Sequence, residues 1–341
     1  MADNPIVLVE ELVKVYPGGT RAVDGIDFSV AEGEFFGFLG PNGAGKSTTM
    51  KVLSTLLKKT SGRVRVAGFD VDRDSGEVRK RIGFAMQEVG VDDLSTGWDF
   101  LVLQGVLYGA SSRSSRARAG ELLELVGLTS VAKRRIGTYS GGMRRRIDLI
   151  GALMHRPEVL FLDEPTTGLD PQSRLAVWEY LIELNGSGVT IFLTTQMMEE
   201  ADRLCERIAI VDVGRIVAEG TPQALKDEVG GELVRVALEG GEQDGRLAAA
   251  EELVGRQAYA TEVSTAGSTL TVTVKDGSAA APEILALLHD AGFTATDLSV
   301  ASPSLDDVFL RHTGRSIRDE EATGSATDRA SAPWLGLSSR R

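Results

Sequence analysis

The sequence predicts an α/β protein in which a mainly parallel sheet is followed by a small α+β domain. Three observations lead to this prediction. Short β-rich segments alternate with helical patterns up to about residue 219, a glycine-rich turn joins a strand to a helix near residue 40, and the order of segments changes after residue 223. Alternating strands and helices are typical of parallel sheets, because parallel neighbours need a crossover connection.

The first domain is expected to span residues 1–222, with a helical subdomain at about 95–155. Apolar β-branched runs predict strands, and apolar residues at helical spacing predict helices. The expected strands are residues 6–10, 26–30, 34–39, 63–66, 82–86, 159–163, 190–194 and 207–212. The expected helices outside the subdomain are residues 46–57, 171–185 and 197–205.

The second domain is expected to span residues 223–314 and to have a ferredoxin-like fold. Its predicted order is β-α-β-β-α-β, which is typical of that fold. The segments are strand 233–238, helix 246–254, strands 258–263 and 269–275, helix 282–291, strand 293–300 and a closing helix at 305–312. Residues 315–341 are rich in Ser, Ala, Gly and charge, so we expect a disordered tail.

Composition excludes several classes of function. The net charge of −12 argues against a general nucleic-acid binder, which would carry a basic surface. The single cysteine, Cys205, cannot form an internal disulfide, which fits a reducing compartment. The acidic start of the chain does not resemble a signal peptide, and no apolar run approaches the roughly 20 residues of a membrane helix. We therefore expect a chain that does not itself cross a bilayer.

A phosphate-binding loop is predicted directly after the strand at residues 34–39. The run has the pattern G-x-x-x-x-G-K-[ST] and predicts a P-loop NTPase. Glycines let the backbone N–H groups turn towards an anion, and the following helix adds its positive end. Lys46 would reach the outer phosphates, and Ser47 would bind Mg²⁺. The alternative is a plain glycine-rich turn. The candidate nucleotide-binding residues are Gly40, Pro41, Asn42, Gly43, Ala44, Gly45, Lys46, Ser47 and Thr48.

Two adjacent carboxylates end the apolar strand at residues 159–163. In a nucleotide site the first, Asp163, would hold Mg²⁺, usually through water, and the second, Glu164, would polarise the attacking water. A strand that ends in Asp-Glu is common in α/β proteins and is weak support alone. Together with the phosphate loop it indicates ATP hydrolysis.

A second anion-binding helix start is predicted at Tyr139-Ser140-Gly141-Gly142-Met143. Serine is a favoured N-cap, and the two glycines leave backbone N–H groups accessible. With the phosphate loop, this run resembles the ATP-binding subunits of ABC transporters, whose signature is Leu-Ser-Gly-Gly-Gln. Tyr139 and Met143 depart from that signature, but the Ser-Gly-Gly core is intact. The resemblance implies that Ser140, Gly141 and Gly142 contact the nucleotide of a second copy.

The other motifs of this family follow in order. Gln87 matches the Q-loop, which would sense the γ-phosphate, bind Mg²⁺ and contact the membrane partner. Gly168-Leu169-Asp170 matches the D-loop, and Tyr16 stands where the family places an aromatic residue on adenine. Without the resemblance, Gln87 could be a solvated strand end and Tyr16 an ordinary strand-edge aromatic residue.

The position of the family's switch histidine is occupied by Gln196. A glutamine amide can donate a hydrogen bond to a γ-phosphate oxygen, but it cannot relay a proton. We therefore expect three catalytic residues with different roles: Glu164 carries hydrolysis, Lys46 binds phosphate, and Gln196 only positions. The alternative for Gln196 is a polar loop residue without a role.

Arg144–Arg146 and the histidines have plainer interpretations. Consecutive helical residues point to different faces, so we expect the three arginines to be solvated or ion-paired; docking to a membrane subunit or lipid is the alternative. His155, His289 and His312 lack neighbours at metal-ligand spacing, so no zinc site is predicted.

Longer runs resemble the daunorubicin/doxorubicin-resistance type of ATP-binding subunit. They include Glu-Pro-Thr-Thr-Gly-Leu-Asp-Pro, Thr-Thr-Gln-Met-Met-Glu-Glu-Ala-Asp and Pro-Ser-Leu-Asp-Asp-Val-Phe. The resemblance implies an ATP hydrolase that uses ATP and Mg²⁺ and pairs with a second copy in a head-to-tail ATP sandwich. It also implies export of a drug-like or lipid-like compound through a separately encoded transmembrane permease, at the cytoplasmic face of the cell membrane, with no nucleic-acid partner.

The alternative function is a soluble regulatory ATPase that acts on ribosomes or nucleic acid. DNA-repair relatives interrupt the ATPase with long coiled coils, and ribosome-acting relatives generally carry two ATPase modules; this chain has neither. A GTPase switch is not supported because the guanine-reading Asn-Lys-x-Asp motif is missing. For residues 223–314 two interpretations remain open, a dimer brace and a ligand-sensing module.

Overall fold

The computed structural model describes residues 5–87, 90–239 and 246–314. The chain divides into two compact units, of which the first extends to Pro222 and the second begins at Gln223. Each unit has its own hydrophobic core, and among the described residues no sheet is shared between them. The segment expected to be a disordered tail, residues 315–341, lies outside the described residues.

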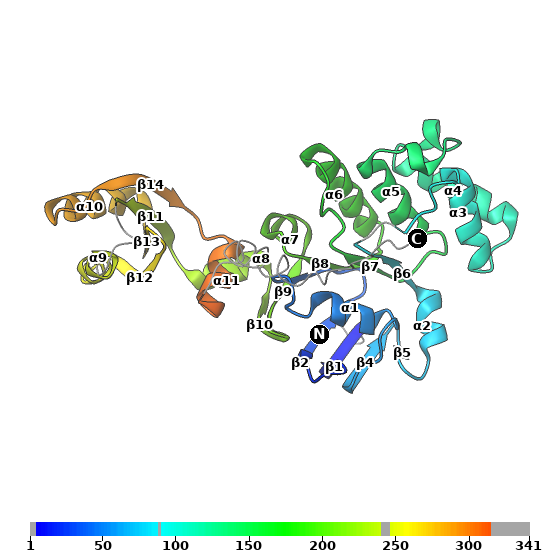
Figure 1. The fold of residues 1–341 in the computed structure, drawn as a ribbon, viewed down its shortest axis with the longest axis horizontal. Coiled ribbons are helices and arrows are strands. Elements are labelled where there is room, and N and C mark those ends of the chain that lie inside the picture. Colours follow the sequence, from blue (N-terminus) through cyan, green and yellow to red (C-terminus); the bar gives the residue numbers. More distant parts are fainter. Residues whose placement is uncertain (1–4, 88–89, 240–245, 315–341) are drawn as a thin grey trace, which may run out of the picture. The chain divides into compact units, whose positions relative to one another are not determined.

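A six-stranded, mainly parallel sheet forms the centre of the first unit (Figure 1). Its strands are β3 (Phe35–Leu39), β6 (Ile82–Ala85), β7 (Val159–Asp163), β8 (Thr190–Thr195), β9 (Arg207–Asp212) and β10 (Arg215–Gly220). The order is β10-β9-β3-β8-β7-β6, and only β10 pairs antiparallel with its neighbour. The prediction of a mainly parallel sheet is confirmed.

The register of this sheet places the predicted site residues at one edge. Leu39 of β3 pairs with Thr195 of β8, and Asp163 of β7 pairs with Thr194. The carboxyl ends of β3, β7 and β8 therefore lie side by side. The crevice beyond the carboxyl ends of parallel strands is where α/β sheets bind ligands.

A separate antiparallel sheet packs within the same unit, and this was not predicted. It contains β1 (Val7–Val15), β2 (Arg21–Val30), β4 (Ser61–Val66) and β5 (Phe69–Asp70), in the order β2-β1-β4-β5. The strands predicted at residues 6–10, 26–30 and 63–66 lie in the same alternating part of the sequence as the parallel strands, but they pair in this sheet. Strand periodicity identifies a strand but does not identify its partner, which explains the difference.

Helix α1 (Lys46–Leu53) lies between the two sheets, in contact with β2 and β4 on one side and β7 and β8 on the other. Aromatic rings from both sheets also pack together in the layer between them. Phe28 of β2 packs against Phe36, Phe38 and Phe192 of the parallel sheet, with ring centroids 5.3 to 5.9 Å apart. This buried layer fixes the start of α1, and with it the loop that precedes the helix.

The opposite face of the parallel sheet carries α5 (Gly141–Gly151), α6 (Pro171–Gly186) and α7 (Met198–Leu204) (Figure 1). The predicted helical block also contains α3 (Gly97–Leu107), α4 (Ser112–Leu125) and the 3₁₀ turns η1 (Thr129–Val131) and η2 (Ile136–Thr138), while α2 (Ser75–Arg81) precedes β6. Four of these helices begin at a residue whose side chain caps the helix, and short polar residues are favoured at that position. The caps are Thr96, Ser111, Ser140 and Asp170.

The second unit has the predicted ferredoxin-like topology. Its antiparallel sheet has the order β12-β13-β11-β14. Residues such as Val234, Val236 and Ile284 form a core of their own between this sheet and its helices. Its elements are β11 (Glu232–Leu238), α9 (Arg246–Gly255), β12 (Ala260–Ala266), β13 (Thr269–Val274), α10 (Gly277–Asp290), β14 (Ala295–Ala301) and α11 (Leu305–Thr313), with α8 (Pro222–Val229) at the boundary.

Some element boundaries differ from the prediction. Helix α10 begins at Gly277 and not at Pro282, because Asp276 accepts a hydrogen bond from the backbone N–H of Ala279 over 3.0 Å. Proline is favoured in a first helical turn, but here a side-chain cap starts the helix earlier. The short elements α2, β5, β10 and α8 were not predicted.

Candidate functional site

The predicted phosphate loop lies between the end of β3 and the start of α1. Its glycines have conformations that other residues rarely adopt: Gly43 and Gly45 have φ of 81° and 104°. At Gly40 a Cβ atom would lie 2.2 Å from the carbonyl oxygen of Val211. The loop therefore depends on glycine at these positions, as an anion-binding turn of backbone N–H groups requires.

Lys46 is buried at the centre of this loop, with 4% of its surface exposed. Its Nζ donates to the carbonyl oxygens of Gly40 and Pro41 over 2.7 and 2.9 Å, and lies 3.6 Å from Oε1 of Glu164. Burial lowers the pKa of Lys46, and the carboxylates of Glu164 and Asp163 oppose this shift. The Lys46 ammonium thus lies between the phosphate loop and the carboxylate of Glu164.

Ser47, Asp163 and Thr194 form a hydrogen-bonded group beside Lys46. The Ser47 hydroxyl donates to Oδ1 of Asp163 over 3.0 Å, and the Thr194 hydroxyl donates to the same oxygen over 2.5 Å. Asp163 is 5% exposed. Thr194 was not predicted as a site residue, although its place at the end of β8 brings it here.

Glu164 faces Lys46 from one side and Gln87 from the other. The amide of Gln87 donates to Oε2 of Glu164 over 3.2 Å, and the Thr167 hydroxyl donates to the same oxygen over 3.3 Å. The backbone of Glu164 has φ of 46°, a left-handed conformation that is unfavourable for this residue type. Its N–H donates to the carbonyl oxygen of Thr194 over 3.0 Å. The structure thus brings Gln87, Lys46, Asp163 and Glu164 together.

Tyr16 follows the end of β1 and lies next to the same helix start. Its hydroxyl is 3.2 Å from Oγ1 of Thr48, and the ammonium of Lys14 lies 5.4 Å from its ring centroid. The side chain is partly exposed. A ring in this position can present a face to a planar ligand.

Ser140, Gly141 and Gly142 open α5 on the other side of the sheet from α1 (Figure 1). Ser140 accepts a hydrogen bond from the backbone N–H of Met143 over 3.3 Å, and both Ser140 and Gly141 are exposed. Among the described residues no hydrogen bond or ion pair joins this segment to the phosphate loop. Within one chain, the two predicted anion-binding turns are therefore not brought together.

Gln196 directly follows β8, two residues after Thr194, whose hydroxyl bonds Asp163. Its side chain is partly buried, and within the described part of the chain its Oε1 has no hydrogen-bond partner. The next residue is fixed, because the N–H of Met197 donates to the Thr195 hydroxyl over 2.9 Å. The backbone therefore holds Gln196 directly after β8, and its buried amide oxygen lacks a partner among the described residues.

Of the two states expected for the three arginines, solvated or ion-paired, Arg145 has the second, because it pairs with Asp148 at 3.4 Å in the protein interior. This residue is only 2% exposed. Arg144 pairs with Asp93 at 2.9 Å, and Arg146 donates to the carbonyl oxygen of Val126 over 2.8 Å. Three consecutive residues point to different faces of a helix, as predicted, but one of those faces is the protein interior.

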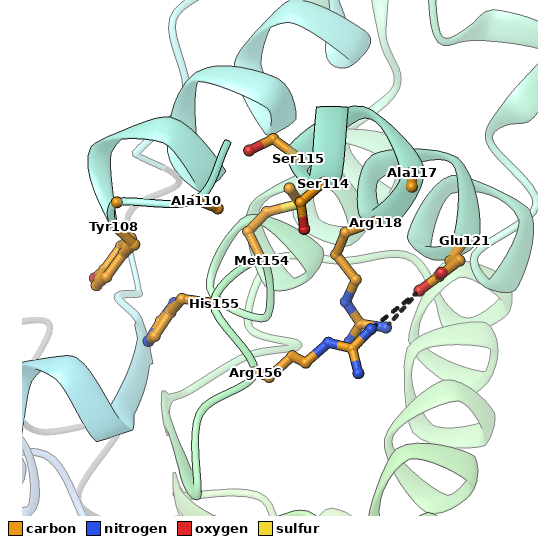
Figure 2. Close-up of a pocket in the computed structure, with 11 residues that line it drawn as sticks. Tyr108, Ala110, Ser114, Ser115, Ala117, Arg118, Glu121, Met154, His155 and Arg156 are labelled. Atoms are coloured by element: carbon orange, nitrogen blue, oxygen red, sulfur yellow. Dashed lines mark hydrogen bonds and ion pairs between the residues drawn. The ribbon is translucent and has the colours of Figure 1, made fainter. Parts of the chain in front are cut away.

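A hollow of about 370 Å³ lies in the helical block (Figure 2). There the ring of Tyr108 stacks on His155 with centroids 3.8 Å apart. Burial lowers the pKa of His155, whose Nε2 lies 2.8 Å from the carbonyl oxygen of Ile82. Arg118 pairs with Glu121 in the same wall. None of the predicted nucleotide or metal residues lines this hollow.

Comparisons with known proteins identify the family. A family model described as ABC transporter matches residues 23–167, and one described as ATP-binding protein DrrA1-3-like, C-terminal domain, matches residues 220–313. The chain is 45% identical over 322 residues to the daunorubicin resistance ATP-binding protein DrrA3 of Streptomyces coeruleorubidus, covering 94% of this chain and 100% of that protein. The chain belongs to the DrrA-like ATP-binding proteins of ABC transporters.

A further relative and two solved cassette structures agree with an ABC ATPase. The linearmycin resistance ATP-binding protein LnrL of Bacillus subtilis is 39% identical over 315 residues, which cover 91% of this chain and 99% of LnrL. The structure of cbiO1 from Clostridium perfringens matches with a TM-score of 0.62 and 28% identity, over 66% of this chain and 92% of that one. The dimeric post-hydrolysis cassette MJ0796, bound to ADP and Pi, matches with a TM-score of 0.58 and 28% identity, over 63% of this chain and 98% of that one. The predicted P-loop ATPase fold is confirmed.

As an ABC ATPase, this DrrA-like protein is an ATP hydrolase of a family that binds ATP with Mg²⁺. The oxygen atoms of Ser47 and Asp163 are ligands of the kind Mg²⁺ prefers. In the described ranges no group of three or more His, Cys, Asp or Glu could hold a metal. No helix in those ranges is long and apolar enough to span a membrane.

Proposed function

We propose that two copies of this chain hydrolyse ATP to drive export of a drug-like or lipid-like hydrophobic compound through separately encoded membrane subunits. Relatives named for daunorubicin resistance, linearmycin resistance and Nod factor export support an export role. The chain would act at the cytoplasmic face of the cell membrane, as a peripheral subunit. Fold and motifs do not select the cargo, so its chemical class rests on these relatives.

The observation that carries the hydrolytic role is the Glu164 carboxylate, held between Gln87 and Lys46 directly after Asp163. We assign Glu164 as the residue that polarises the attacking water. Lys46 and the loop N–H groups would bind the phosphates, with adenine against Tyr16. Ser47, Asp163 and Gln87 would hold Mg²⁺, which supplies charge neutralisation at the phosphates.

We also propose that each ATP site is built from residues of two copies of the chain. Ser140 and Gly141 are exposed and open α5, on the other side of the parallel sheet from α1, so we expect them to contact a nucleotide on another copy. Two copies related head to tail would each close the other's site. The dimeric form of MJ0796 supports an assembly of two cassettes.

A complementation experiment tests this arrangement. Lys46→Ala disables the phosphate loop, and Ser140→Arg places a long cation at the signature turn. Each variant alone should be inactive. Mixed dimers, however, contain one intact site, built from the loop of one copy and the signature of the other. An equal mixture should regain up to about a quarter of the wild-type sites. A mixture as inactive as its parts would contradict the head-to-tail arrangement.

The export role needs a separate experiment. The tagged chain is purified from detergent-extracted membranes, and hydrophobic compounds are screened for stimulation of its ATPase activity. Recovery of a membrane subunit and stimulation by one compound class support the proposal. Recovery of ribosomes or nucleic acid without a membrane subunit would favour the regulatory alternative.

We further propose residues 223–314 as an accessory domain, separate from the ATPase at 1–222 with its helical subdomain at about 95–155. The contact boundary at Gln223 and the family match at residues 220–313 support this division. Deletion after residue 223 distinguishes its two possible roles. Loss of ATP-dependent dimerisation indicates a brace; intact dimerisation with loss of compound-stimulated activity indicates a sensing module.

A further inference from the structure

Arg145 is a buried cation that bonds three carbonyl oxygens on two backbone segments beside the proposed ATPase site. It lies on α5, five residues after the signature residue Ser140. Its Nε donates to the carbonyl oxygen of Pro165 over 2.6 Å, one terminal nitrogen donates to that of Met86, and the other lies 3.4 Å from that of Asp163. A planar guanidinium can satisfy several acceptors at once, which a lysine ammonium cannot do in the same geometry.

The three acceptors flank the two side chains that face the reaction. Asp163 and Pro165 are the residues immediately before and after Glu164, and Met86 immediately precedes Gln87. The left-handed backbone of Glu164 persists only if its surroundings hold it. Arg145 bonds the carbonyl groups on both sides of that strained residue. It therefore restrains the backbone that aims Glu164, and the start of the segment that carries Gln87.

Charge around Arg145 explains why it can remain buried. Burial lowers the pKa of its guanidinium, and the carboxylates of Asp148, Glu200 and Asp163 oppose this shift. Glu200 is itself fixed, because it accepts hydrogen bonds from Thr166 and Trp178 over 2.6 and 2.9 Å. The cation is thus part of a balanced interior network in which each partner has a defined position.

We propose that Arg145 is a positioning residue that links the signature helix to Glu164 and Gln87 of the same chain. The inference rests on the role proposed for Glu164. When Ser140 engages a nucleotide on the second copy, a shift of α5 reaches Arg145 through about 8 Å of rigid helix. Arg145 passes that shift to the backbone around Glu164. Closure of the ATP site that Ser140 completes on the second copy therefore positions Glu164 in the site of its own chain.

The test compares Arg145→Gln with a matched control, Arg146→Gln. Arg146 lies on the same helix and binds the backbone carbonyl oxygens of Val126 over 2.8 Å and, more weakly, Gly142 over 3.4 Å, and neither carbonyl adjoins Glu164 or Gln87. Arg145→Gln should lower kcat about 10- to 100-fold, because small misplacement of a reacting group has effects of that size. The Kd for ATP should change less than about threefold. Arg146→Gln should lower the Tm and leave kcat within about threefold of wild type.

A second readout separates positioning from a merely structural role. If Glu164 is misplaced after ATP has bound, ATP-bound dimers should accumulate with Arg145→Gln in Mg²⁺ and ATP, as with Glu164→Gln. If Arg145→Gln does not fold, Arg145→Lys decides the question by the same measurements. A normal kcat, or a parallel loss of ATP affinity and Tm without trapped dimers, would overturn the inference.

A double substitution distinguishes failure of this inference from failure of the proposed function. In single-turnover measurements, adding Arg145→Gln to Glu164→Gln should reduce the rate less than about threefold further, because the group that Arg145 aims is already lost. If the two substitutions instead reduced the rate by independent factors that multiply, the link between Arg145 and Glu164 would be overturned. Near-normal turnover of Glu164→Gln alone would instead contradict the role of Glu164 itself.

Discussion

Ser47 and Asp163 lie 116 residues apart in the chain, yet the Ser47 hydroxyl donates to Oδ1 of Asp163 over 3.0 Å. The contact joins the first turn of α1 to the end of β7. Thr194 donates to the same carboxylate oxygen, so two hydroxyl groups fix its orientation. A serine hydroxyl and a carboxylate held in this way are ligands of the kind that Mg²⁺ binds together with phosphate oxygens and water.

Asp163→Asn should therefore impair metal-dependent activity specifically. The amide keeps the shape of the side chain but removes the negative charge, so kcat/KM should fall about 100-fold at limiting Mg²⁺. A Mg²⁺ titration of steady-state ATPase activity measures the effect. Thr194→Ser, which keeps the hydroxyl donor, should stay close to wild type. An Asp163→Asn enzyme with an unchanged Mg²⁺ dependence would exclude this residue from the metal site.

Glu164→Gln and Gln196→Ala should have very different effects on turnover. Loss of a general base costs about 10²- to 10⁴-fold in kcat, whereas a neutral positioning group contributes less, about tenfold or below. Both variants should still bind ATP, which equilibrium binding of a fluorescent ATP analogue can verify. The assignment is wrong if Glu164→Gln keeps near-normal turnover while Gln196→Ala abolishes it.

Tyr16→Ala should weaken nucleotide binding without slowing the chemical step. An aromatic stacking contact contributes about 1 kcal/mol, so the Kd for ATP should rise about fivefold. Tyr16→Phe removes only the hydroxyl near Thr48 and should bind ATP almost as well as the native chain. Equal losses in both variants would indicate that the hydroxyl, and not the ring, holds the nucleotide.

Asp148 should make the free energy of unfolding depend on pH. Burial raises its pKa to about 6, although the Arg145 guanidinium, 3.4 Å away, opposes this. The ionised form is therefore costly in the folded state above pH 6, and the cost is relieved as the pH falls through 6. Asp148→Asn cannot titrate, so its stability relative to wild type should decline by about 1 to 3 kcal/mol between pH 8 and pH 4. Urea unfolding across this range measures the difference, and a pH-independent difference would contradict the raised pKa.

Local sequence patterns predicted the candidate residues at the sheet edge well. The loop glycines, Lys46, Ser47 and Asp163 could be named because each belongs to a short motif directly after a recognisable strand, whereas Gln87 was named from the family resemblance. Parallel strands align their carboxyl ends, so motifs after such strands converge in space. Their individual roles remain predictions, which the substitutions above address.

The sequence by itself determined the P-loop ATPase fold, the ferredoxin-like second unit and the residues that come together at the carboxyl ends of β3, β7 and β8. Only the tertiary structure decided which strands form the separate antiparallel sheet, because periodicity does not choose a strand's partner. It also decided that Arg145 is buried against the carbonyl groups around Glu164, while Arg144 is not. No local pattern predicts this difference, because the burial of one arginine in a run of three depends on the packing of α5 against distant segments of the chain.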